Sequence, residues 1–321
     1  MFFTGCTASL VGGDELINLD NLPANNRLYG GAAGVKIGLT LNNENWLVKF
    51  PGNLKSKQLK GVDLSYSNSP VCEYLGSHVY ELLGIPVHET QLATRDGKTV
   101  VMCKDFRGSK DFYHFSDLKA TFEPAFVNQD GITTDGCGTD LDEALLVIRE
   151  HHVLRNVPGV EYRFWQMFVV DFIIGNPDRN NGNWGILVMD NDVELAPVYD
   201  CGNSFCDKWD DVKMRRFLSD NDAMRGEAYG GKVCFFSKND KRIKPYRFLR
   251  NTDESVCRDA ICNIIDSWEE RNVFESFKIL LENTLPLSET QREFYYRIVS
   301  MRIEKLKEIV TKYSASESHV F

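Results

Sequence analysis

The sequence contains no long uninterrupted apolar run, which excludes a helix that spans a membrane. The longest apolar stretch lies near 164–175, where Gln166 and Asp171 interrupt it, and it is too short to cross a bilayer. The first six residues also lack the basic start and the long apolar segment of a signal peptide. We therefore expect a protein without a membrane span.

Basic residues are fewer than acidic ones, 37 against 46, and the formal net charge is −9. Because a nucleic-acid binder needs a basic surface or a strong basic patch, we expect no direct contact with nucleic acid. Two short basic clusters are exceptions to this excess of acidic residues. We interpret them as solvated surface: Lys55, Lys57 and Lys60, and Lys238, Lys241, Arg242 and Lys244.

The nine cysteines include no Cys-x-x-Cys pair. Their odd number, and the lack of histidines at finger spacing, argue against a disulfide framework and against zinc. Reduced thiols in a reducing compartment such as the cytoplasm fit best, although the sequence leaves secretion into a host open.

Periodicity predicts the secondary structure. Alternating apolar residues predict two strands, 35–41 and 46–50, around a turn at 42–45. A helix beginning at Ser69-Pro70 and ending at Gly84 follows, and then a second hairpin over 87–105. The remaining predictions are polar loops at 51–68 and 237–254, an irregular stretch at 107–140, and helices at 141–154, 160–174, 255–283 and 289–313.

This order predicts an α+β protein with a β-rich first part and a helical second part. With 321 residues the chain is long enough for two lobes. Kinases have the same order, with the nucleotide between the lobes. We therefore expect an N-lobe at 1–106 and a C-lobe at 107–321.

A polar loop and the segment after it carry the most informative motif. Asp178 and Asn183 lie in an Asn-rich loop that follows an apolar run, and Asp200 lies at the end of the next β-like segment. In kinases one Asp accepts or orients the proton of the attacking hydroxyl, while an Asn and a second Asp hold magnesium on the phosphates. Taken alone, the Asp178–Asn183 loop is equally consistent with an ordinary turn.

Lys49 and Glu73 are candidates for a second pair. Lys49 ends a short strand after the glycine-rich segment, where a lysine can neutralise the α- and β-phosphates. Glu73 lies early in the following helix, and in protein kinases a helix Glu positions that lysine. The alternatives are a solvated lysine at a strand end and a first-turn Glu that favours the helix dipole.

Gly30, Gly31 and Gly34 form a glycine-rich turn ahead of Lys36. Glycines let backbone amides approach a phosphate, and Lys36 adds positive charge. The spacing matches neither Gly-x-Gly-x-x-Gly nor the P-loop pattern, so an ordinary glycine turn is an equal alternative.

Taken together, these motifs resemble the HipA-like kinases, and more closely the CtkA family of bacterial serine/threonine kinases. The matching segments are 29–36, 47–51, 72–74, 103–106, 172–185 and 196–202. The resemblance implies a bilobal fold related to protein kinases and phosphatidylinositol kinases, with ATP and Mg²⁺ as cofactors.

The resemblance also assigns roles. It implies Asp178 as catalytic base, Asn183 and Asp200 as metal ligands, and Lys49 as the phosphate-binding lysine. It further implies that Lys104, Asp105 and Phe106 lie at the hinge, where backbone groups meet adenine.

This chain departs from protein kinases in two motifs. Asn176-Pro177-Asp178 replaces His-Arg-Asp, and no Ala-Pro-Glu follows Gly202. Asp178-Arg179-Asn180 resembles the Asp-Arg-His of lipid kinases. These departures bear on the substrate more than on phosphoryl transfer.

The sequence therefore predicts an ATP- and Mg²⁺-dependent serine/threonine kinase that acts on a protein and is able to phosphorylate itself. The alternatives are a lipid or small-molecule kinase and a non-catalytic nucleotide-binding module. The turn from Tyr29 to Lys36 has no Ser or Thr, so autophosphorylation is expected elsewhere, at Thr40, Ser65, Ser67 or Ser69, or outside this lobe. The oligomeric state is unknown.

Overall fold

Two tight hairpins build the main sheet of the computed structural model, which describes residues 15–30, 35–55, 64–122, 140–237 and 241–317. Asn42 and Asn43 both have positive φ, 51° and 62°, and so do Asp96 and Gly97, 51° and 67°. Two adjacent left-handed residues match the right-handed twist of the flanking strands, and Asn, Asp and Gly adopt this conformation most readily. The turn predicted at 42–45 is confirmed at Asn42 and Asn43, whereas Glu44 and Asn45 already belong to a strand, and the hairpin predicted over 87–105 turns at Asp96-Gly97.

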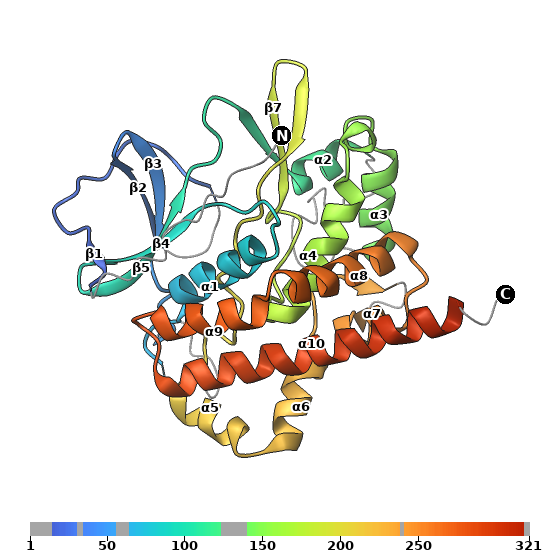
Figure 1. Cartoon of the computed structure of the whole chain (residues 1–321). Helices are drawn as coiled ribbons and strands as arrows, with labels where there is room; N and C mark the ends of the chain where they lie inside the picture. The colour runs from blue at the N-terminus through green and yellow to red at the C-terminus, as the bar shows by residue number, and fades with distance from the viewer. Residues whose placement is uncertain (1–14, 31–34, 56–63, 123–139, 238–240, 318–321) are drawn as a thin grey trace.

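The hairpins form a five-stranded sheet in the order β1-β4-β5-β3-β2. Only β1 and β4 pair in parallel; the other neighbours are antiparallel. Helix α1 packs against β4 and β5 (Figure 1). The elements are β1 (Ile17–Asn18), β2 (Lys36–Leu41), β3 (Glu44–Lys49), α1 (Ser69–Leu82), β4 (Thr90–Arg95) and β5 (Lys98–Lys104).

The rest of the chain is mostly helical, with two small antiparallel sheets, β6-β7-β8 and β9-β10. Its first elements are β6 (Asp111–His114), α2 (Phe115–Phe122), α3 (Leu141–Glu150), α4 (Val160–Ile174), β7 (Gly185–Met189) and β8 (Asp192–Leu195). Those that follow are α5 (Asp211–Leu218), α6 (Asn221–Gly230), β9 (Phe236–Ser237), β10 (Lys241–Arg242), α7 (Pro245–Asn251), α8 (Ser255–Glu270), α9 (Val273–Asn283) and α10 (Glu289–Glu317).

Helix α4 is the centre of the larger hydrophobic core. Its second half is buried almost completely, and it packs against α3, α7, α8 and α10. It ends at Gly175, where φ is +71°. Since a left-handed residue at this position favours glycine, the chain turns sharply here into the polar loop. Helix α10 crosses the lower half of the molecule, and α5 and α6 pack beneath it (Figure 1).

Four predictions of secondary structure were wrong in part. The stretch 107–140 contains β6 and α2, and the loop 237–254 contains β10 and α7. The helix expected at 141–154 ends at Glu150, and a 3-10 turn, Leu154–Asn156, follows it. The helix expected at 255–283 is two helices, because Asn272 is left-handed with φ +49° and interrupts the helix.

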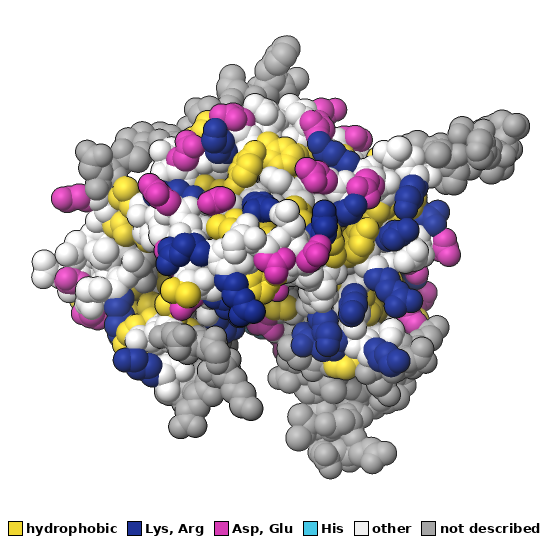
Figure 2. All heavy atoms as spheres, turned by 90° about the horizontal axis from the view of Figure 1, so that it is seen from below, with side chains coloured by type: hydrophobic (Ala, Val, Ile, Leu, Met, Phe, Trp, Pro, Cys, Tyr) yellow, Lys and Arg dark blue, Asp and Glu magenta, His cyan; other side chains and the backbone are white. Residues whose placement is uncertain are grey.

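The face of the molecule seen from below mixes charges of both signs. Lys and Arg side chains, Asp and Glu side chains and scattered hydrophobic ones alternate across it (Figure 2). No helix among the described residues is long and apolar enough to cross a bilayer.

Candidate active site

Lys49 joins the sheet, helix α1 and the segment at Asp200. Its Nζ lies 3.1 Å from Oε1 of Glu73 and 2.9 Å from Oδ1 of Asp200. Burial favours the neutral amine, but the carboxylates of Asp200 and Glu73 outweigh it and raise the pKa of Lys49 well above its usual value. The ammonium is therefore charged at neutral pH and held between two acids.

Glu73 is almost fully buried and is the fifth residue of α1, beyond the first turn in which it was predicted. Its Oε1 accepts a hydrogen bond from the backbone N–H of Asp200 at 3.0 Å and lies 3.1 Å from Nε2 of His88. Burial would raise its pKa, but Lys49 and the His88 contact lower it. Glu73 thus fixes Lys49 and Asp200 together, and the helix-dipole alternative does not describe it.

Lys36 lies directly opposite Lys49, across the β2–β3 pair. It is the first residue of β2, in agreement with the strand predicted over 35–41. Burial and then the charge of Lys49 lower the pKa of Lys36, and its Nζ donates to the carbonyl of Gly30 at 3.3 Å. Gly31 and Gly34 lie outside the described residues.

Three asparagine side chains surround Asp178. Oδ1 accepts from Nδ2 of Asn180 at 3.1 Å, and Oδ2 accepts from Nδ2 of Asn203 at 2.8 Å. The Asp178 N–H in turn donates to the side chain of Asn176 at 3.1 Å. The carboxylate is therefore held from both sides on a loop that begins where α4 ends.

Asn183 is anchored by one end of its amide. Nδ2 donates to the carbonyl of Asp178 at 2.7 Å. This bond turns Oδ1 away from that carbonyl, and Oδ1 accepts no hydrogen bond from the described part of the chain. An amide oxygen presented in this way suits a hard cation.

Arg179 connects Asn183 to Asp200. Its Nη1 donates to the carbonyl of Asn183 at 2.9 Å and also to the carbonyl of Tyr199. Asp200 follows immediately and is left-handed, with φ +62°. Its Oδ1 faces Lys49, while Oδ2 has no hydrogen-bond partner among the described residues. One buried guanidinium therefore holds the backbones of both predicted metal ligands.

Sequence reasoning did not single out Arg179, Asp171, Asn203 or His88. Asp171 is buried in α4 and receives the guanidinium of Arg179, so its charge is balanced inside the core. The adjacent Asp178-Arg179 dipeptide is the one local signal for Arg179. Nothing near Asn203 or His88 in the sequence marks them, because their partners are distant along the chain.

The three residues expected at the hinge differ from one another. The Lys104 ammonium pairs with Glu44 and Glu89 at the surface, and the buried Asp105 carboxylate pairs with Arg27 and Arg107. Backbone N–H groups of Lys104 and Asp105 donate to the carbonyls of Glu89 and Asn45. These two residues therefore offer neither a side chain nor an N–H group to a nucleotide.

Phe106 is the exception among these three residues. Its N–H donates to no described residue, and its ring packs 5.6 Å from Phe112 and 5.7 Å from Tyr199, centroid to centroid. Tyr199 immediately precedes Asp200. An aromatic cluster thus connects Phe106 to the segment that carries Asp200.

A cavity of about 230 Å³ adjoins the polar loop on another side. Its lining includes Pro177, Asn203, Asp207 and Lys232 but neither Lys49 nor Asp200. Burial raises the pKa of Asp207 to about 6, and the charge of Asp178 adds to the effect. The charge of Lys208 opposes this shift, and burial outweighs it.

The α+β fold, the ion pair between Lys49 and Glu73, and the polar loop that carries Asp178 and Asn183 together define a kinase-like phosphotransferase. Residues 28–268 match the HipA-like C-terminal domain family, so the chain belongs to that family. It is 34% identical over 286 residues to the serine/threonine-protein kinase CtkA of Helicobacter pylori, which covers 88% of this chain and 83% of that protein.

Solved structures agree with this assignment. The crystal structure of a Helicobacter pylori proinflammatory kinase, CtkA, matches with a TM-score of 0.78 and 31% identity, over 92% of this chain and 98% of that one. A chain of the Shewanella oneidensis HipA, HipB and operator DNA complex matches with a TM-score of 0.55 and 13% identity, over 92% and 70%. The second match supports the fold alone. The prediction of a HipA-like, CtkA-like kinase is confirmed.

Proposed function

We propose that this chain transfers the γ-phosphoryl group of ATP to a serine or threonine hydroxyl of a protein, with Mg²⁺ as the metal. The observation that carries the proposal is the position of Lys49 between Glu73 and Asp200, next to a loop that holds Asp178 and Asn183. We also propose the bilobal arrangement, with an N-lobe at 1–106, a C-lobe at 107–321 and the nucleotide between them.

The residues fit ATP and Mg²⁺. Oδ1 of Asn183 and Oδ2 of Asp200 accept no hydrogen bond from the residues that the structure describes, and magnesium prefers oxygen ligands. Lys49 and Lys36 supply adjacent positive charge for phosphates. When bound, Mg·ATP provides the phosphoryl group and neutralises much of its charge.

The protein's own part in the reaction is to position groups and balance charge. Asp178 orients the acceptor hydroxyl and accepts its proton at the carboxylate, which Asn180 and Asn203 hold in place. Glu73 keeps Lys49 extended toward Asp200. Arg179 keeps Asn183 and Asp200 at a fixed separation through their neighbouring carbonyls.

Phe106 is proposed as the adenine contact. Its N–H is available to an acceptor nitrogen of the base, and its ring forms an apolar wall with Phe112 and Tyr199. Lys104 and Asp105 support the hinge through ion pairs instead of touching the base.

The structure separates the expected autophosphorylation sites by exposure. Ser67 is buried and its hydroxyl contacts Ser69 at 2.8 Å, whereas Thr40 is exposed at the edge of the sheet. Ser65 and Ser69 are half-buried, so if the chain phosphorylates itself in this region, Thr40 is the most exposed of the four hydroxyls.

Incubation with γ-labelled ATP and Mg²⁺, in the presence of candidate proteins and of lipid vesicles, tests the function. We expect label in protein serine or threonine, and none with Asp178→Asn. Label in lipid would identify a lipid kinase. ATP binding without any transfer would identify a nucleotide-binding module and overturn the proposal.

A further inference from the structure

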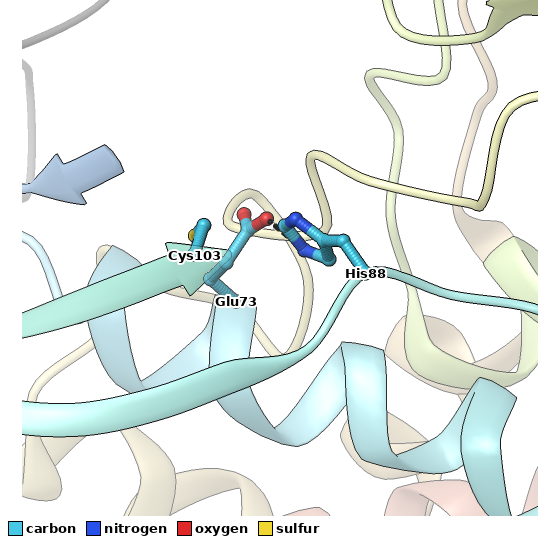
Figure 3. Close-up of side chains that lie close together, drawn as sticks. All are labelled: Glu73, His88 and Cys103. Atoms are coloured by element: carbon cyan, nitrogen blue, oxygen red, sulfur yellow. Dashed lines mark ion pairs between the residues drawn. The ribbon is translucent and has the colours of Figure 1, made fainter. Parts of the chain in front are cut away.

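Three side chains lie close together beside Lys49 and offer three kinds of ligand atom: a carboxylate oxygen, an imidazole nitrogen and a thiol sulfur. Glu73 comes from α1, His88 from the segment before β4, and Cys103 from the end of β5, and all three are buried (Figure 3). One ligand atom from each lies within 4.8 Å of the other two. Among the described residues this is the one group of three or more His, Cys, Asp or Glu side chains whose ligand atoms lie this close together.

The hydrogen bonds of this cluster leave one oxygen unsatisfied. Oε1 of Glu73 is shared by Lys49, by the N–H of Asp200 and by Nε2 of His88. Oε2 of the same carboxylate is buried and has no hydrogen-bond partner among the described residues. A buried carboxylate oxygen without a partner is costly, so an ordinary hydrogen-bonded network does not account for the whole cluster.

Cys103 adds a ligand that the proposed kinase chemistry does not use. Its thiol is buried beside Lys49 and Glu73, and burial raises its pKa well above the usual value. A buried neutral thiol is inert, but a metal ion stabilises the thiolate at neutral pH.

We propose that Glu73, His88 and Cys103 form a binding site for a borderline-soft divalent cation, for which Zn²⁺ is the best match. Thiolate, imidazole and carboxylate are the three ligand types that zinc binds, and a water completes the tetrahedron. Hard Mg²⁺ disfavours sulfur and nitrogen, so this site is distinct from the one proposed at Asn183 and Asp200.

The charges and protons balance. Lys49, Glu73 and Asp200 together carry a formal charge of −1, and a zinc ion with one thiolate adds +1. Binding releases the thiol proton to solvent. The imidazole of His88 coordinates through Nε2, which exchanges its 3.1 Å contact with Oγ of Ser77 for the metal, and carries its proton on Nδ1.

Occupancy of this site competes with Lys49 for Glu73. A carboxylate bound to zinc is drawn away from the ammonium, which leaves Lys49 paired with Asp200 alone. This consequence rests on the proposed function: zinc at this site lowers phosphoryl transfer by disturbing the lysine that contacts the phosphates. The sequence gives no motif for the site, because its ligands lie on three separate elements.

Cobalt and zinc titrations of the nucleotide-free protein test the metal site independently of phosphoryl transfer. Co²⁺ occupies zinc sites, and a thiolate ligand produces a charge-transfer band in the near ultraviolet. We expect a band that Zn²⁺ abolishes, and Cys103→Ala should lose it. Cys257→Ala, which removes a buried thiol in α8, is the matched control and should behave as wild type.

Affinity and inhibition give two further measurements. Cys103→Ala should weaken Zn²⁺ binding by more than the roughly 10–100-fold that loss of an outer partner costs. The variant's phosphoryl transfer should resist zinc concentrations that inhibit wild type, whereas zinc that merely replaces Mg²⁺ on ATP would inhibit both equally.

Circular dichroism confirms that each variant is folded, and His88→Gln replaces Cys103→Ala if that variant is not. The absence of a cobalt band, or a band that persists in Cys103→Ala and His88→Gln, overturns the site. Equal zinc sensitivity of wild type and Cys103→Ala overturns the inhibition. If wild type bound cobalt through Cys103 but transferred no phosphate, the proposed function would fail and the metal site would stand.

Discussion

Arg179 donates two hydrogen bonds to the carboxylate of Asp171. Nε lies 2.8 Å from Oδ2, and Nη2 lies 3.1 Å from Oδ1. Both side chains are buried, and Tyr80 and Asn176 also donate to Oδ1 of Asp171. The remaining guanidinium nitrogen binds the carbonyls before Asp200 and at Asn183. The pair therefore links the core of α4 to the two proposed metal ligands.

Removal of the guanidinium should destabilise the whole fold. Arg179→Met leaves the Asp171 carboxylate buried without its cation, and we expect a loss of about 3–5 kcal/mol in the free energy of unfolding. Urea denaturation measures this loss. Arg155→Met, at an exposed position, should change stability by less than about 0.5 kcal/mol. Equal effects of the two substitutions would contradict the role given to Arg179.

Asp178→Asn should abolish transfer without preventing nucleotide binding. The amide keeps the shape of the side chain but accepts no proton, so kcat should fall by about 10²–10⁴-fold. The Kd for ATP, measured by calorimetry, should stay within a few-fold of wild type because Asp178 acts on the acceptor. Asp192→Asn, on the exposed strand β8, serves as control. Activity of Asp178→Asn within a few-fold of wild type would refute its assignment as the base.

Lys49 and Lys36 should differ in importance although they lie side by side. Lys49→Met removes the cation between Glu73 and Asp200, so kcat/KM should fall by at least about 100-fold. Lys36→Met should have a smaller effect, mainly on the KM for ATP, because its polar contact is the carbonyl of Gly30. Steady-state kinetics with varied ATP measure both. A larger loss for Lys36→Met would reverse the ranking and the assignment.

Asp207 should make stability depend on pH. Its pKa is raised from 3.8 to about 6, mainly by burial, so the folded chain binds this proton more tightly than the unfolded chain does. Its contribution to the free energy of unfolding should therefore decline as pH rises from about 4 through 6, by up to about 3 kcal/mol.

Asp207→Asn isolates this effect. The variant should be more stable than wild type at pH 7.5 and should lose that advantage near pH 4. Asp259→Asn, which changes an exposed acid in α8, is the matched control. Urea midpoints at several pH values measure the comparison, and parallel pH profiles for wild type and Asp207→Asn would disprove the expected titration.

Local signals predicted a large part of the fold. The hairpin turns follow from Asn42-Asn43 and Asp96-Gly97, since these residues tolerate positive φ. Gly175 correctly marked the end of α4. In contrast, Asn272 also adopts positive φ but lies between two helical patterns of the same period, so periodicity alone joined α8 to α9.

The site was less predictable than the fold for a physical reason. Lys49, Glu73, Asp178, Asn183 and Asp200 could be proposed because kinase chemistry requires those residue types in that order. His88, Asn203 and Asp171 act through partners that folding brings close, and a sequence does not display such pairs. The same limit applies to Lys104 and Asp105, whose ion partners Glu44 and Arg27 are remote in the chain.

Lys49 and Asp200 are in contact although 151 positions separate them in the sequence, so Lys49 is synthesised well before its partner. A ribosome that adds about 5–20 residues per second needs roughly 8–30 s to proceed from one residue to the other. Until then the nascent chain contains Lys49 and Glu73, but Asp200, the second acid that contacts Lys49, has not been synthesised. A newly made N-terminal half is therefore unable to assemble the phosphate site, and the cell gains a competent enzyme only after most of the chain has left the ribosome.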